Sequence, residues 1–206
     1  MAMSRILLPL LAISLPGIIA GDATKPVYDT DGNELSSDSQ YYVRPADDKN
    51  AGGDLRARQG ELEECPFFLV QARREDTAGL VQFTQRNNST GGAVHLSSDI
   101  TIHFTQLATF CVESTNWFVT HRPPFLSSPS GPSQYVAVGT PKAHVDPPLA
   151  EVFRIEEHDD GKTKGYKLVS SAGEGPSKDL GLHASSKNRS WMAVTGSPLV
   201  VVFKKG

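Results

Sequence analysis

Long apolar runs are absent from this 206-residue chain once its first twenty residues are passed. No later stretch approaches the roughly 20 consecutive apolar residues that a membrane-spanning helix needs, so the sequence predicts no membrane partner. The early run, Ile6 to Ala20, follows the lone charge of Arg5 and ends in a small residue, as a secretory signal peptide does. We therefore expect a signal peptide over 1–20 and one secreted domain over 21–206, with a vacuolar or seed storage compartment as the alternative destination.

Cysteine is almost as scarce, with only Cys65 and Cys111 in the whole chain. This count excludes the dense disulfide framework of small secreted scaffolds and any zinc site built from several cysteines. In an exported chain two cysteines favour one disulfide, the alternative being two free buried thiols. Such a disulfide would close a loop of about 47 residues and stabilise the fold by roughly 4 kcal/mol in the chain-entropy description.

Also missing are the patterns typical of nucleic-acid binding, metal binding and catalysis. Acidic residues outnumber basic ones by 23 to 20, and no basic stripe with interleaved aromatics exists, so we expect no nucleic-acid partner. None of the six histidines stands at metal-ligand spacing from a cysteine or another histidine. No Gly-x-Ser-x-Gly elbow and no complete phosphate loop occur. We therefore expect neither an enzyme nor a bound metal or other cofactor.

What the chain does contain is a succession of short β-type runs separated by turn-forming residues. No window keeps an apolar period of 3.6 residues, so helices are expected to be minor or absent and the fold class is all-β. The twelve predicted strands are Tyr41–Val43, Phe67–Gln71, Leu80–Thr84, Val94–Leu96, Ile100–Phe104, Trp117–Thr120, Tyr135–Val138, Val152–Ile155, Tyr166–Val169, Leu180–Leu182, Trp191–Val194 and Leu199–Phe203.

Some of these runs recur at an interval of about 50 residues. Three repeats of four strands predict a threefold barrel closed by hairpins, which is a β-trefoil. A β-sandwich with an accidental period is the alternative. The recurring runs are 67–70, 117–119 and 166–169 in one set, and 100–102, 151–153 and 200–202 in the other.

The pattern Val-x-Asp-x-x-Gly-x-x-Leu over 27–35, followed by Tyr-x-Val over 41–43, resembles the N-terminal signature of the plant Kunitz (soybean trypsin inhibitor type) family. Leu-Ser-Ser-Asp over 96–99 and the ending Val-Val-Val-Phe-Lys-Lys over 200–205 are most similar to its cereal α-amylase/subtilisin inhibitor branch. The resemblance implies a β-trefoil, secretion, and inhibition of serine proteases, of α-amylase, or of both. Further matches are Cys65-Pro66, Cys111, Ser114–Trp117, Phe153–Glu156, Tyr166–Leu168 and Asp179–Gly181.

Two positions depart from the family pattern. The family usually has a second disulfide within the segment that corresponds to 170–178, which contains no cysteine here. So short a clip contributes only roughly 2 kcal/mol, so its absence loosens a hairpin without abolishing the fold. An asparagine that often braces the inhibitory loop is replaced by Ser37, whose side chain is shorter. The amylase-type branch tends to lack this asparagine as well, so Ser37 is interpreted as a feature of the branch.

The resemblance places the inhibitory loop midway between the two cysteines, with the scissile bond near Asn88-Ser89. Trypsin-like targets need Arg or Lys at the specificity position, and Arg86 would serve only if the register shifted by two. Small or polar residues there favour a subtilisin-like target, so the expected partners are a secreted subtilisin-like serine protease, α-amylase, or both, bound by a monomer. The predicted contact residues are Arg86, Asn87, Asn88, Ser89, Thr90 and Gly91.

Three N-glycosylation sequons complicate this prediction. Two of them overlap in the loop itself, starting at Asn87 and Asn88, and the third starts at Asn188. A glycan in the loop would block entry into a narrow protease cleft, whereas unoccupied sequons would leave inhibition intact. The alternative function is therefore a non-inhibitory binding or storage protein that keeps the same scaffold. A carbohydrate-binding trefoil is less favoured, because no repeated Gln-x-Trp pattern occurs.

A second segment, 121–132, is also expected to be exposed. Its four prolines favour extended backbone, and Phe125-Leu126 would form an apolar tip. It could contact a protease or α-amylase, but a plain connection between strands is the favoured interpretation.

Overall fold

The computed structural model describes residues 25–47, 52–73, 76–86, 91–108, 111, 114–126, 131–140, 150–171, 176–185, 187 and 189–206. All regular secondary structure in these ranges is β, and no helix there is long and apolar enough to cross a membrane. The strands are β1 (Tyr41–Pro45), β2 (Leu55–Gln59), β3 (Phe67–Gln71), β4 (Leu80–Gln85), β5 (Ile100–Phe104), β6 (Trp117–Thr120), β7 (Tyr135–Val138), β8 (Val152–Asp159), β9 (Lys164–Ser171), β10 (Lys178–Ala184), β11 (Ser190–Val194) and β12 (Val200–Lys205).

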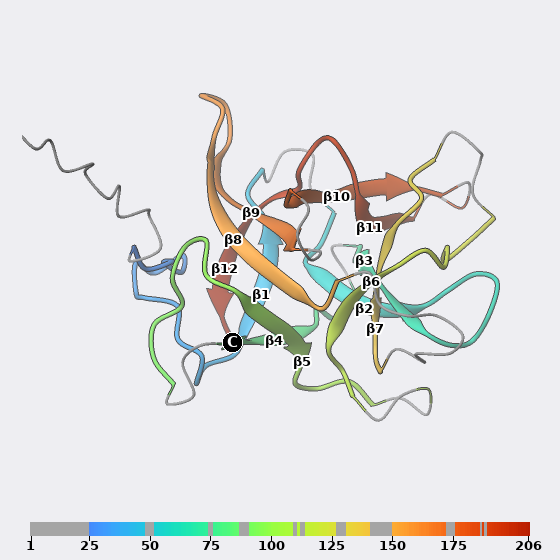
Figure 1. The fold of residues 1–206 in the computed structure, drawn as a ribbon, viewed down its shortest axis with the longest axis horizontal. Coiled ribbons are helices and arrows are strands. Elements are labelled where there is room, and N and C mark those ends of the chain that lie inside the picture. The colour runs from blue at the N-terminus through green and yellow to red at the C-terminus, as the bar shows by residue number, and fades with distance from the viewer. Residues whose placement is uncertain are drawn as a thin grey trace, which may run out of the picture.

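Six of the strands close into a barrel. Antiparallel pairs join β12 to β1, β1 to β4, β4 to β5, β5 to β8, β8 to β9, and β9 back to β12. The other six form three hairpins, β2–β3, β6–β7 and β10–β11, which pair with one another through β3, β7 and β11 to form a cap. In Figure 1 the barrel lies on the left and the cap on the right. The chain is thus a β-trefoil, as predicted from the strand pattern.

The equivalent strands of the three repeats differ from those predicted from the 50-residue spacing. Each repeat gives its first and fourth strands to the barrel and its second and third to the cap. The segments paired by their 50-residue spacing, 67–70, 117–119 and 166–169, belong to β3, β6 and β9, which are the third, second and first strands of their repeats. The repeats have connections of unequal length, so equal spacing does not identify equivalent strands.

One predicted strand is wrong and one real strand was missed. Val94–Leu96 forms no ladder strand; its middle residue, His95, and the preceding Ala93 make only isolated bridges to the N-terminal segment. β2 was missed because arginines occupy alternate positions in Leu-Arg-Ala-Arg-Gln and no residue is β-branched or aromatic. Its side chains nevertheless alternate between the core and the outer face, as in other strands, because Leu55 and Ala57 face the core.

The β6–β7 hairpin of the cap is buried on both faces. Along β6, Trp117 and Val119 point into the barrel core, whereas Phe118 belongs to a second apolar cluster on the outer face of the cap. Phe125 joins this outer cluster with only 5% of its surface exposed, and its ring stacks on His183 at 5.8 Å. The prediction of an exposed apolar tip is therefore wrong for Phe125, because burying its aromatic ring in the outer cluster is more favourable than exposing it to water. Leu126, the next residue, is 86% exposed.

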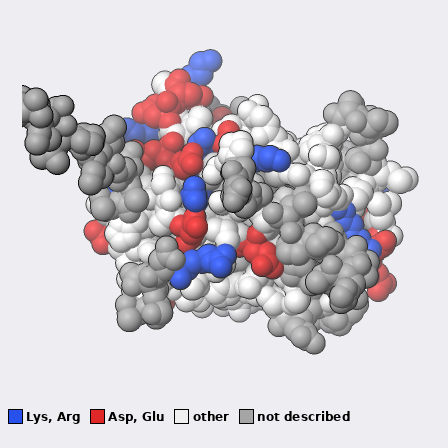
Figure 2. All heavy atoms as spheres, viewed as in Figure 1, with Lys and Arg blue, Asp and Glu red and all other residues white. Residues whose placement is uncertain are grey.

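The surface of the barrel carries charges of both signs in close alternation. Figure 2 shows acidic and basic side chains following the long β8–β9 hairpin. Lys167 Nζ lies 2.9 Å from Asp179 Oδ1 and 3.2 Å from Glu156 Oε2, and these carboxylates raise the pKa of Lys167. Lys25 also pairs with Glu157. This surface is consistent with the small net charge of the chain.

The predicted disulfide is present. Cys65 and Cys111 are bonded, with their Cα atoms 5.4 Å apart, so the β2–β3 connection is joined to the β5–β6 connection. The two cysteines are 46 residues apart in sequence, so the disulfide joins two distant connections of the fold.

Replacing both cysteines, as in Cys65→Ser/Cys111→Ser, should lower the free energy of unfolding by about 4 kcal/mol, because the unfolded chain regains the freedom of a long loop. Urea denaturation of the wild type and the variant, each with and without reductant, measures this. The reductant should destabilise only the wild type. A difference below about 1 kcal/mol would contradict the prediction.

Candidate functional site: the loop between β4 and β5

The predicted contact loop connects β4 to β5, and both of its stems are held by the body of the protein. On the first stem, the Arg86 N–H donates to the carbonyl of Asp99 at 3.1 Å, continuing the β4–β5 hairpin ladder. On the second stem, the Gly92 carbonyl accepts from the Ser37 N–H at 2.9 Å and from Ser37 Oγ at 3.2 Å. The backbone thus leaves and returns to the scaffold at fixed points.

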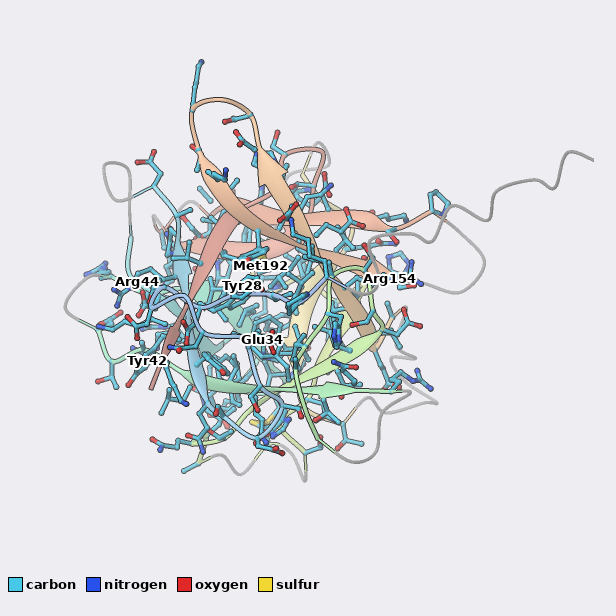
Figure 3. The ribbon with its side chains drawn as sticks, turned by 90° about the vertical axis from the view of Figure 1, so that its left-hand side faces the viewer. Tyr28, Glu34, Tyr42, Arg44, Arg154 and Met192 are labelled. Atoms are coloured by element: carbon cyan, nitrogen blue, oxygen red, sulfur yellow. A yellow bond between two sulfur atoms is a disulfide. The ribbon has the colours of Figure 1, made fainter. Side chains whose placement is uncertain are left out.

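The N-terminal segment forms the platform beneath this loop. Val27 N–H donates to the carbonyl of Val94 at 2.8 Å, Val94 N–H to that of Leu35 at 2.6 Å, and Leu35 N–H to that of Val27 at 2.7 Å. The side chains of all three are fully buried in the barrel core. Figure 3 looks onto this end of the barrel, where Tyr28 and Glu34 mark the segment crossing the middle of the face.

The spacing of the N-terminal signature has a direct physical basis in this platform. Asp29 Oδ1 accepts the N–H groups of Asp31 and Asn33, both at 2.9 Å, which holds the chain in a tight turn. Gly32 lies in that turn at a φ of +81°, where a side chain would be strained. Tyr41 is buried, and its hydroxyl accepts the N–H of Ser36 at 2.9 Å. The signature therefore builds the turn and the core contacts that support the loop.

Two glutamines of β4 reinforce the stems. Gln82 Nε2 donates to the carbonyl of Ser37 at 2.6 Å, and Gln85 Nε2 donates to the carbonyl of Ala93. His103 stands opposite Gln82 in the β4–β5 register, and burial lowers its pKa, so at neutral pH it adds no positive charge beside the loop support. Gln85 thereby supports the second stem directly, and Gln82 supports Ser37, which itself binds that stem.

The far end of the connection is tied to β8. Arg154 Nε donates to Asp99 Oδ1 at 2.7 Å, and the Ser97 N–H donates to the carbonyl of Ile155 at 2.9 Å. Ser97 has a φ of +56°, which a serine adopts only where its surroundings hold it. The Asp99–Arg154 pair is about one-third exposed, so it contributes at most about 1 kcal/mol and serves chiefly to orient the turn.

The predicted contact residues divide between described and undescribed parts of the chain. Arg86 lies on the first stem, and Gly91 lies beside the second with a φ of +76°. Residues 87–90, which include Asn87, Asn88, Ser89 and Thr90, fall outside the described residues, as does Asn188. Their predicted roles therefore remain predictions.

Sequence reasoning missed the residues that hold the stems. Gln82 and Arg154 alternate with buried neighbours, so the pattern marks them as outward-facing but gives no sign of their partners, and Gln85 lies beyond the last buried residue of β4. Ser37 was expected to brace the loop poorly, and it reaches only Gly92, on the second stem. Among the described residues, no group of three or more His, Cys, Asp or Glu side chains could hold a metal ion.

Comparison with known proteins assigns the family. The family model Kunitz_legume, described as trypsin and protease inhibitor, matches residues 27–205. The chain belongs to this family. An α-amylase/subtilisin inhibitor of Oryza sativa subsp. japonica is 37% identical over 208 residues, covering 97% of this chain and 92% of the relative.

Two further relatives agree with this assignment. An endogenous α-amylase/subtilisin inhibitor of Triticum aestivum is 33% identical over 186 residues, covering 87% of this Kunitz protein and 96% of the relative. The solved structure of the rice bifunctional α-amylase/subtilisin inhibitor from Oryza sativa matches with a TM-score of 0.66 at 32% identity, covering 88% of this chain and 99% of that one. The family and these relatives are inhibitors rather than enzymes.

The substitution Gly91→Ala tests whether inhibition depends on the backbone geometry of the second stem. An alanine at this φ is strained by about 1–3 kcal/mol, and its Cβ would lie 2.8 Å from Asp38 Oδ2. The chain would relieve this by moving the loop from its presented geometry, so inhibition of the target protease should weaken by about tenfold or more. Inhibition constants and thermal unfolding of the variant measure the effect.

The matched control for this change is Gly161→Ala in the β8–β9 hairpin. Gly161 has a similar φ of +78°, and an added Cβ would meet nothing within 4 Å. It should lower stability without changing inhibition. Full inhibition by a folded Gly91→Ala variant would show that the stem geometry is not needed.

Proposed function

We propose that this Kunitz protein inhibits a subtilisin-like serine endopeptidase by inserting the backbone of residues 86–91 into the protease cleft. The supporting observation is the double anchoring of that segment, at Arg86 to Asp99 and at Gly92 to Ser37. A loop whose ends are fixed in advance loses little conformational entropy on binding. The names of the rice and wheat relatives, both α-amylase/subtilisin inhibitors, support the same target class.

The position of Arg86 favours subtilisin over trypsin. Its backbone N–H is committed to the hairpin ladder through Asp99, so Arg86 belongs to the stem of the loop. A trypsin-like enzyme would need this arginine at the specificity position, which requires a shift of two residues toward the apex. The small and polar residues that follow it, Asn88 and Ser89, suit the less charge-selective cleft of a subtilisin-like enzyme.

We further propose inhibition of α-amylase, secretion and a monomeric state. The proposal of α-amylase inhibition rests on the names of the rice and wheat relatives. Secretion rests on the signal-peptide pattern of residues 1–20. The competing function is a non-inhibitory binder, which the two sequons at Asn87 and Asn88 favour if they carry glycans.

A titration of mature protein against subtilisin, trypsin, chymotrypsin and an α-amylase tests the proposal directly. Protein from a eukaryotic host, before and after enzymatic deglycosylation, should be compared with protein from a bacterial host that adds no N-glycans. We expect stoichiometric inhibition of subtilisin by the unglycosylated protein, and a gain on deglycosylation if the loop is modified. An Asn188→Gln variant removes the third sequon, so it controls for glycans elsewhere. Folded protein that inhibits none of the four enzymes in either form would favour the non-inhibitory binder.

The register of the loop is tested with Arg86→Ala. If Arg86 is a stem residue, inhibition of subtilisin should change by less than about tenfold, since the backbone hydrogen bond to Asp99 survives the substitution. Inhibition constants for subtilisin and trypsin, measured in parallel on wild type and variant, separate the two registers. Strong trypsin inhibition in the wild type that disappears in the variant would place Arg86 at the specificity position instead.

A further inference from the structure

A hollow of about 580 Å³ opens on the cap, between the β2–β3 hairpin and the start of β11. Its volume lies within the range of small-molecule sites. Unlike most such sites, the described part of its wall is largely polar and basic, with four arginines and a single acidic residue. The lining consists of Gly52, Arg56, Arg58, Val70, Gln71, Ala72, Arg73, Asp76, Arg189 and Ser190.

Strand alternation explains how these arginines meet. In β2 the side chains of Leu55 and Ala57 face the core, so Arg56 and Arg58 share the opposite face. Arg56 stands in register with Val70 of β3, and Val70 in turn with Trp191 of β11. Arg189 stands two positions before Trp191 and therefore reaches the same side of the cap.

Among the residues that the structure describes, the acidic groups near the hollow do not balance its positive charge. Asp76 Oδ2 lies 3.6 Å from Arg56 Nη1 and also accepts the backbone N–H of Arg73 at 3.2 Å. Glu61, outside the lining, lies 3.5 Å from Arg189 Nη1 but is shared with Lys187 at 3.4 Å.

In the part of the chain that the structure describes, Arg58 lacks a compensating acidic partner. Among the described residues, no acidic side chain lies within 4.0 Å of its guanidinium. Burial, followed by the charges of Arg189 and Arg56, lowers the pKa of Arg58. The guanidinium nevertheless stays charged at neutral pH, because the pKa of arginine is so high. The cluster therefore carries repulsion that a bound anion would relieve.

We propose that this hollow binds a small molecule carrying two or more phosphate or sulfate groups. Guanidinium groups hold such tetrahedral oxyanions through paired N–H donors, and several of them here face one space. One phosphate would occupy only a small part of 580 Å³, so a multiply charged ligand fits the volume and the number of arginines better.

The hollow and the inhibitory loop lie on different parts of the molecule. The loop leaves β4 and returns to β5 on the barrel, at the left in Figure 1, whereas β2, β3 and β11 lie in the cap at the right. Anion binding should therefore leave protease inhibition unchanged. The failure of either function would not imply the failure of the other.

Isothermal titration calorimetry with sodium tripolyphosphate and, separately, with a sulfated disaccharide tests the proposal on the full mature protein at low and at physiological ionic strength. Arg56→Gln/Arg58→Gln should weaken binding by about tenfold or more, because it removes two charged hydrogen-bonding partners. The matched control, Lys204→Gln/Lys205→Gln, removes the same charge from exposed positions of β12 and should bind as the wild type does.

Each outcome of this titration is decisive. Binding that is lost in the arginine pair and kept in the lysine pair supports the site, and the relative affinity for the two probes assigns phosphate or sulfate as its ligand chemistry. Failure of the wild type to bind either probe, or an equal loss in both pairs, would overturn it. Should the double variant unfold, Arg58→Gln alone serves in its place, since it breaks no ion pair among the described residues.

Discussion

The candidate loop depends on three backbone hydrogen bonds that join Val27, Leu35 and Val94 in a closed cycle. Each donates to the next, and each buries its side chain completely in the barrel core. The polar backbone is thereby satisfied where it enters the apolar interior, which unpaired N–H or C=O groups could not do without cost. Any movement of the stem at Gly92 would have to break this cycle or pull an apolar side chain from the core. The core therefore fixes the loop stem.

Side chains from both the barrel and the cap form that core. Most barrel strands bury one face, whereas the β6–β7 hairpin of the cap buries both, so β6 and β7 have no exposed position among their residues. On the barrel side, Phe83 packs edge-on against Phe203 with ring centroids 5.3 Å apart. Outside the cap, Phe125, Tyr135 and Trp191 cover the hairpins. Apolar contacts on both sides make the scaffold rigid enough to hold exposed loops without a helix in the described residues.

The sequence predicted what depends on local pattern and missed what depends on long-range pairing. Alternation and aromatic content located eleven of the twelve strands, and the signature residues indicated the family. Leu55–Gln59 was missed because its β character comes from pairing with β3. Val94–Leu96 has strand-like residues, yet its partner is an irregular segment that no propensity identifies. The contacts of Gln82 with Ser37 and of Arg154 with Asp99 could not be predicted for the same reason, because each partner lies in a different part of the fold.

The arginines of the hollow also come together only through long-range strand pairing. Arg56 and Arg189 are far apart in sequence and unremarkable as single surface residues; only the pairing of β2, β3 and β11 brings them to one space. In β2, Leu55 and Ala57 face the core and Arg56 and Arg58 face away from it, so these arginines can vary without disturbing the core that supports the loop. A trefoil can therefore carry two separate recognition surfaces on one rigid body. Composition alone does not reveal the second, because the net charge of the whole chain is −3.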